Sequence, residues 1–145
     1  MILSVSNINK HFDGNDILIN CSFNVEDHEK VAVVGVNGAG KSTLFKIIVN
    51  ELEPDSGVVT LAKDKTLGYL SQYQNISSDN SVYDEVLKDR MTLFISHRLG
   101  AVRDADEIMV LRNGSVIAMD NHNNLMDYCE YYSNLYNSQR ELYYE

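Results

Sequence analysis

Residues 35–43 read Gly35-Val36-Asn37-Gly38-Ala39-Gly40-Lys41-Ser42-Thr43, and the expected fold class follows from this segment. It matches the pattern G-x-x-x-x-G-K-[ST] of a phosphate-binding loop. Glycines let the backbone wrap closely and point its N–H groups at a phosphate, and the helix that follows adds the positive end of its dipole. The residues expected to bind the phosphates of a nucleotide are Asn37, Gly38, Ala39, Gly40, Lys41, Ser42 and Thr43.

Two side chains of this loop have separate tasks. We expect the Lys41 ammonium to reach the β- and γ-phosphates as a point charge and the Ser42 hydroxyl to coordinate Mg²⁺. The chain has no Asn-Lys-x-Asp motif, with which a GTPase of the usual kind recognises its base. The alternative for the segment is a glycine-rich turn that holds no ligand.

The flanks of the loop predict an α/β fold. Residues 30–34 are β-branched and continuously apolar, which suits a central parallel strand covered on both faces. After the loop, the spacing of Leu44, Phe45, Ile48 and Leu52 predicts a helix with one apolar face.

The remaining pattern predicts an antiparallel β part before the loop and a mixed part after it. Strands are expected at residues 2–6, 17–25, 57–61, 66–70, 92–96, 107–111 and 116–119. Helices are expected at residues 81–88, 99–106 and 124–144. Asn113-Gly114 is a hairpin signal. The tyrosines of residues 128–144 predict a helix packed by an aromatic stripe, with a partner surface as the alternative.

Composition bounds the class of protein. The chain has 145 residues and a net charge of -9, which fits one acidic globular domain and argues against bulk binding to nucleic acid or an anionic membrane. No apolar run is long enough to span a bilayer, and the first residues do not read as a signal peptide. Cys21 and Cys129 are expected to be free thiols in a reducing cytosol.

The segments around the loop resemble the ATP-binding cassette (ABC) family. After the loop come Glu-Pro-Asp-Ser-Gly at residues 53–57 and Leu-Gly-Tyr-Leu-Ser-Gln at residues 67–72, in that family's order. Residues 1–90 look most like the soluble, duplicated ABC-F proteins. The resemblance implies that Phe12 stacks on adenine and that Gln72 senses Mg²⁺ and the attacking water. The alternatives are a core aromatic for Phe12 and a strand-end polar residue for Gln72.

A second segment resembles the switch region of the same family. Residues 92–99 read Thr-Leu-Phe-Ile-Ser-His-Arg-Leu, and by this resemblance His97 hydrogen-bonds the γ-phosphate. This part looks more like the C-terminal end of an exporter cassette. We expect the other histidines, His11, His28 and His122, to be solvated.

Two expected motifs of that family are not in the sequence. The sequence contains neither the Leu-Ser-Gly-Gly-Gln signature nor Walker B, which is an apolar strand that ends in Asp-Glu. The chain thus resembles one abbreviated ABC-type domain in two parts, residues 1–90 and 91–145, without the helical subdomain. Asp120 and Glu107 are poor replacements for Walker B. The resemblance implies that Asp120 belongs to a peripheral hairpin, and Glu107 precedes the apolar residues of its expected strand and so lies at the wrong end.

These observations lead to two main hypotheses. In the first, the chain binds MgATP through the loop, with Gln72 and His97 at the γ-phosphate, Ser42 and Gln72 at the metal, and weak or absent hydrolysis. In the second, it is a non-enzymatic scaffold or dimerisation remnant of a cassette. A different P-loop ATPase or kinase is a third and weaker hypothesis.

The resemblance also bears on the binding partners and the cellular location of the chain. In that family the switch strand lies beside the phosphate-loop strand, so the resemblance implies that residues 30–34 pair with residues 92–96. A missing Walker B strand leaves a vacancy beside residues 92–96, which residues 66–70 or a second chain would fill by swapping or edge pairing. The exporter resemblance implies a transporter membrane subunit, while the charge disfavours nucleic acid or the ribosome. The expected location is cytoplasmic, peripheral to a membrane through a partner.

Overall fold

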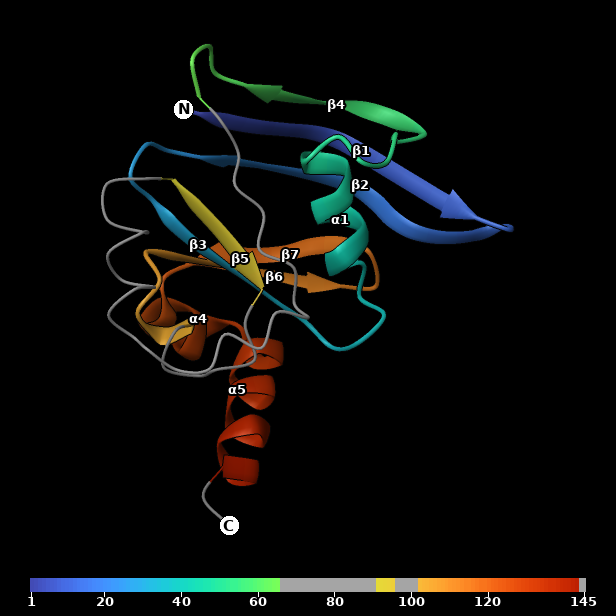
Figure 1. The fold of residues 1–145 in the computed structure, drawn as a ribbon. Coiled ribbons are helices and arrows are strands. Elements are labelled where there is room, and N and C mark those ends of the chain that lie inside the picture. Colours follow the sequence, from blue (N-terminus) through green and yellow to red (C-terminus); the bar gives the residue numbers. More distant parts are fainter. Residues whose placement is uncertain (66–90, 96–101, 144–145) are drawn as a thin grey trace.

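The computed structural model describes residues 1–65, 91–95 and 102–143, which form two sheets and three helices (Figure 1). The antiparallel sheet has the order β2-β1-β4, with β1 (Leu3–Phe12), β2 (Asn15–Val25) and β4 (Ser56–Leu61). The second sheet has the order β5-β3-β6-β7, with β3 (Lys30–Val34), β5 (Thr92–Ile95), β6 (Glu107–Arg112) and β7 (Ser115–Asp120). The helices are α1 (Lys41–Ile48), α4 (His122–Tyr128) and α5 (Glu130–Tyr143). The predicted α/β class is confirmed.

Strand β3 is the centre of the second sheet, as its continuous apolar run predicts. It pairs in parallel with β5 on one side and with β6 on the other. Val31 and Val33 pack into a core with α1 and the antiparallel sheet, while Ala32 and Val34 pack into a second core with α4 and α5. Figure 1 shows α1 on one side of this sheet and α4 and α5 on the other. A strand buried on both faces therefore holds the start of the phosphate loop rigidly.

Helix α1 ends earlier than its apolar spacing suggests. Leu44, Phe45 and Ile48 are buried as predicted, but the helix stops at Ile48. Asn50 takes a positive φ of 63°, and the N–H of Leu52 returns to Lys46 O at 3.2 Å. This left-handed turn closes the helix, as is common at helix ends. Leu52 still packs against the core from beyond the helix.

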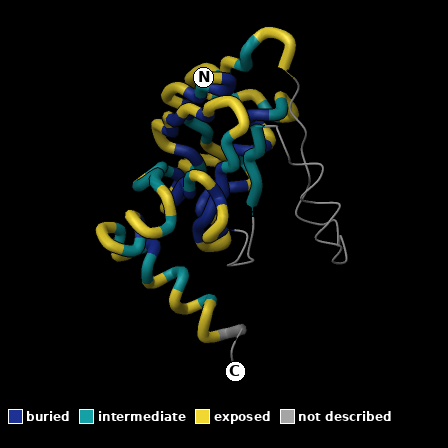
Figure 2. The backbone as a smooth tube through the Cα atoms, turned by 90° about the vertical axis from the view of Figure 1, so that its left-hand side faces the viewer, coloured by how far each residue is buried: buried dark blue, intermediate teal, exposed yellow. Residues whose placement is uncertain are grey.

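The C-terminal segment forms two helices where one was expected. Cys129 has φ -102° and ψ 91°, an extended conformation that separates α4 from α5. Asn121 fixes the start of α4, since its side chain accepts a hydrogen bond from the N–H of Asn124 at 2.9 Å. Leu125 and Tyr132 are fully buried, which confirms packing through an aromatic stripe. Figure 2 shows that α5 extends away from the body of the molecule and that much of the helix is exposed.

The expectation that His122 is solvated is wrong. Its Nδ1 lies 2.9 Å from the hydroxyl of Tyr132, and its ring is 4.7 Å from that of Tyr136. Burial, and after it the nearby charge of Arg103, lowers the pKa of His122. His11 and His28 are exposed, as expected, although His11 Nδ1 lies 2.5 Å from Asp55 Oδ2. The local sequence pattern does not predict these contacts of His122, because its partners Tyr132 and Tyr136 lie in the following helix, α5.

His122 should therefore make the fold sensitive to mild acid. Its pKa in the folded protein lies below the unfolded value of about 6.5, so the unfolded state takes up the proton first as pH falls. The stability that neutral His122 contributes is complete above about pH 6.5 and declines as pH falls below it. We expect His122→Gln to flatten this decline in denaturant melts between pH 7.5 and 5. The exposed His28→Gln is the control, and an unchanged slope in His122→Gln would contradict the assignment.

Several expected elements lie outside the described residues. These are the strand at residues 66–70, the helix at 81–88, the end of the strand at Ser96 and the start of the helix near Leu99. The predicted pairing of residues 30–34 with residues 92–96 is confirmed as far as Ile95 by the β3–β5 ladder. Cys21 is buried and Cys129 half-buried, both as free thiols. In the described part, no helix is both long and apolar enough to cross a membrane.

Candidate functional site

Residues 35–40 form the loop between the carboxyl end of β3 and α1, where the motif predicts it. Gly38 and Gly40 take positive φ values of 85° and 104°, which side chains with a Cβ rarely adopt. The N–H of Ala39 donates to Val36 O at 3.1 Å, and the N–H of Leu44 donates to Gly40 O at 2.9 Å. The loop therefore closes on itself and runs directly into the first turn of the helix.

The turn between β6 and β7 supports this loop through a backbone hydrogen bond. The N–H of Gly114 donates to Ala39 O at 3.0 Å, and Gly114 O accepts from the N–H of Ile19 at 2.8 Å. A Cβ on Gly35 would lie 2.5 Å from Leu111 O, so β6 also approaches the beginning of the loop. The sequence predicts the hairpin at Asn113-Gly114 but not this support, which joins residues 75 positions apart.

Lys41 lies inside the loop instead of reaching into solvent. Its side chain is 7% exposed. Its Nζ donates to Gly35 O and lies 3.5 Å from Val36 O. Burial lowers the pKa of the Lys41 ammonium. The loop thus holds a positive charge among its own carbonyl groups, beside the start of α1.

The loop and the first turn of α1 fit a magnesium nucleotide. A Cβ on Gly38 would meet nothing within 4 Å, so the backbone there is open to an approaching phosphate. Ser42 is exposed and Thr43 half-buried on the first turn, and that turn carries no acidic residue to repel an anion. A hydroxyl at this place is a hard oxygen ligand of the kind Mg²⁺ prefers.

Phe12 lies at the end of β1, paired with Asn15 across the first hairpin. It is 44% exposed and is therefore not the core aromatic of the alternative interpretation. The Lys10 ammonium lies 5.1 Å from its ring centroid. The same hairpin reaches the loop further along β2, since a Cβ on Gly40 would lie 2.8 Å from Ile17 O. An exposed ring thus stands at the loop side of the antiparallel sheet.

Two predicted site residues, Gln72 and His97, lie outside the described residues. The structure therefore brings together seven of the predicted residues on the loop and first turn, namely Asn37, Gly38, Ala39, Gly40, Lys41, Ser42 and Thr43, with Phe12 on the neighbouring sheet. The roles of all these residues toward a nucleotide stay predictions.

The two carboxylates considered as replacements for Walker B lie away from the loop. Glu107 begins β6 opposite Val31, at the end of the sheet remote from the loop. Burial, and after it the charges of Glu29, Asp120 and Asp106, raises the pKa of Glu107. Asp120 ends the edge strand β7 and accepts a hydrogen bond from Asn124. Neither carboxylate faces the phosphate loop.

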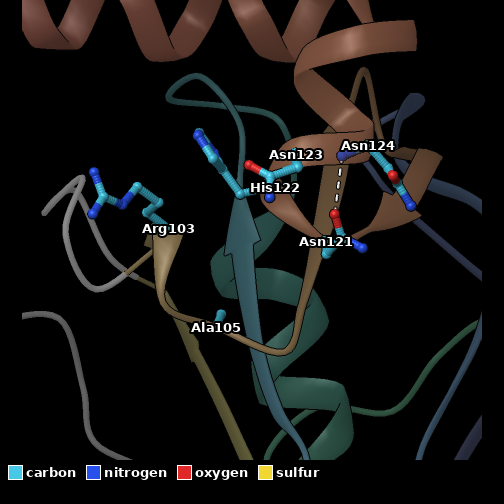
Figure 3. Close-up of a pocket in the computed structure, with 6 residues that line it drawn as sticks. All are labelled: Arg103, Ala105, Asn121, His122, Asn123 and Asn124. Carbon is cyan, nitrogen blue, oxygen red and sulfur yellow. Dashed lines mark hydrogen bonds between the residues drawn. The ribbon is translucent and has the colours of Figure 1, made fainter.

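A polar pocket of about 580 Å³ lies at the same remote end of the sheet (Figure 3). Its lining residues are Arg103, Ala105, Asn121, His122, Asn123 and Asn124. This pocket was not predicted, because its residues form no sequence motif and come from two separate segments. Since β6 and β7 run between this pocket and the loop, the two are separate features of the molecule.

Comparisons with known proteins agree with this geometry. The sequence model of the ABC transporter family matches residues 18–128. The putative ATP-binding protein YdiF of Bacillus subtilis is 41% identical over 87 residues, which cover 60% of this chain and 14% of that protein. The energy-dependent translational throttle protein EttA of Escherichia coli K12 is 39% identical over 87 residues, covering 59% of this chain and 16% of EttA. ABC transporter F family member 5 of Arabidopsis thaliana is 36% identical over 129 residues, covering 86% of this chain and 18% of that protein.

A solved structure shows the same fold. A bacterial Atm1-family ABC exporter with ATP bound superposes with a TM-score of 0.77 and 19% identity, over 94% of this chain and 41% of that chain.

The chain spans less than a fifth of the length of the three curated relatives named above.

Proposed function

The chain belongs to the ABC transporter family, in its ATP-binding domain, and from this premise we propose that it binds MgATP at the phosphate loop with weak or absent hydrolysis. The observation that carries the proposal is the buried Lys41 ammonium, held inside a loop that opens at Gly38 and leads into α1. Within the described residues this ammonium contacts the backbone oxygens of Gly35 and Val36, and a buried ammonium is costly unless an anion joins it. A polyphosphate supplies that anion.

The proposed roles follow from where the groups lie. Backbone N–H groups of residues 37–41 surround the phosphates, Lys41 neutralises them, and Ser42 holds the metal. Phe12 offers its exposed ring to the adenine. By family resemblance, Gln72 assists at the metal and His97 at the γ-phosphate. The bound Mg²⁺ would neutralise charge on the β- and γ-phosphates.

We propose weak hydrolysis because of the carboxylates that the reaction requires. Phosphoryl transfer to water needs a group that orients the water and a metal held from two sides. The sequence contains neither an apolar strand that ends in Asp-Glu nor the signature motif, and Glu107 and Asp120 lie at the end of the sheet remote from the loop. Loss of such groups lowers the rate by orders of magnitude.

Calorimetry and phosphate release together test the proposal. We expect micromolar binding of MgATP to the chain at a single site. Phosphate release should be no faster than from Lys41→Ala at saturating MgATP. Robust turnover that Lys41→Ala abolishes would contradict the hydrolysis part, and an absence of binding in a well-folded sample would contradict the binding part and favour the scaffold alternative.

The place of the chain in a larger system belongs to the same proposal. Because the chain matches only a small part of its relatives, we propose one abbreviated ATP-binding domain, residues 1–145, that acts with a further segment or chain in the cytoplasm. A membrane subunit is one such partner, and a second copy is another, with β5 at the edge of the described sheet as the pairing strand. Size-exclusion chromatography with light scattering separates the second copy from a monomer.

A further inference from the structure

An arginine at the end of β6 contacts the C-terminal helix. The guanidinium carbon of Arg112 lies 4.7 Å from the ring centroid of Tyr131, within the range of a cation–π contact. Arg112 is exposed, whereas Tyr131 is half-buried and packs against the core beneath α5. The ring is therefore the fixed partner, and the guanidinium is held by it.

Arg112 directly precedes the turn that supports the phosphate loop. Asn113 and Gly114 take positive φ values of 50° and 80°, as in a two-residue hairpin turn. Gly114 then donates to Ala39 O and accepts from Ile19. A continuous series of contacts thus runs from α5 through Arg112 and the turn to the loop.

The hydrogen bond at Ala39 has a consequence for phosphate binding. In a trans peptide the C=O and the next N–H point in opposite directions. Because Ala39 O is held toward Gly114, the N–H of Gly40 points away from the turn. The turn therefore sets the direction of one of the loop amides that face the phosphates in the proposed function.

We propose that Arg112 and Tyr131 are positioning residues for the phosphate loop. Their contact holds the β6–β7 turn where Gly114 meets Ala39, and so keeps the Gly40 amide oriented for a phosphate. This inference rests on the proposed MgATP site, but the support itself exists without a nucleotide and is measurable on the chain alone.

The test compares variants that differ only in the stacking contact. Tyr131→Leu keeps an apolar side chain against the core and loses the ring, while Tyr131→Phe keeps the ring. Arg112→Gln loses the cation. Tyr128→Leu is the matched control, because Tyr128 is a 58% exposed tyrosine of α4. Amide hydrogen exchange is read at Gly114 and at Val33 in the nucleotide-free chain, and the Kd for MgATP is read by calorimetry.

We expect exchange at Gly114 to be about threefold to fivefold faster in Tyr131→Leu and Arg112→Gln, with no change at Val33. The Kd for MgATP should rise by a similar factor, and Tyr131→Phe should behave like the wild type in both measurements. Equal exchange at Gly114 in all variants, or the same acceleration in Tyr128→Leu, would overturn the proposal. If the wild type binds no MgATP, the proposed function fails, while the exchange data still decide whether Arg112 and Tyr131 hold the turn.

Discussion

Gly114→Ala should lower the free energy of unfolding by about 3–4 kcal/mol, whereas Gly14→Ala should lower it by about 1 kcal/mol. Both glycines occupy the second position of a two-residue hairpin turn, with φ values of 80° and 82°. They differ in their surroundings. A Cβ on Gly114 would lie 2.3 Å from the backbone oxygen of Ile17, while a Cβ on Gly14 would meet nothing within 4 Å.

The difference between the two variants therefore isolates the close approach of the turn to β2. Gly14→Ala reports only the strain of a left-handed alanine. Gly114→Ala must also displace backbone, and with it the hydrogen bonds of Gly114 to Ala39 and Ile19. Urea denaturation of both variants at neutral pH measures the two losses. Equal losses would show that the turn does not press against Ile17, and the described support of the phosphate loop would be wrong.

Lys41→Met should weaken MgATP binding by at least about 30-fold while leaving the fold almost as stable as the wild type. The affinity falls because a charge-assisted contact to the phosphates is lost. The free energy of unfolding should stay within about 1 kcal/mol, since relief from burying an ammonium offsets the lost bonds to Gly35 and Val36. Calorimetry gives the affinity and thermal melts give the stability.

The pKa of Lys41 adds a second signature to the same variant. It is lowered in the folded protein, so the folded state disfavours the proton at neutral pH, and this penalty is relieved as pH rises through the folded pKa toward about 10.4. The wild type should gain stability over that range relative to Lys41→Met. A variant that binds MgATP as tightly as the wild type would contradict the role assigned to Lys41.

Sequence reasoning predicted the elements whose signals are local. Residues 30–34 show their buried parallel strand in their own composition, the glycine-lysine motif fixes the loop after it, and Asn113-Gly114 marks a two-residue turn by residue type alone. Each of these depends on neighbours within a few positions. The family resemblance added the expectation that residues 30–34 pair with residues 92–96, which β3 and β5 confirm as far as Ile95.

The features that sequence reasoning missed are long-range or depend on a single backbone angle. The bond from Gly114 to Ala39 joins segments that no periodicity relates. The break at Cys129 leaves the three- and four-residue spacing of the apolar positions almost unchanged, so the pattern read as one helix. His122 looked polar in its context, yet Tyr132 and Tyr136 cover it from the next helix.

The nucleotide site can be located directly by following the backbone amide resonances of the chain as MgATP is added. We expect saturable shifts at residues 37–43 and at Gly114, and none at residues 121–124, which line the remote polar pocket. An absence of shifts at the loop in a folded sample, or shifts confined to the remote pocket, would contradict the claim that the loop around Lys41 is the nucleotide site.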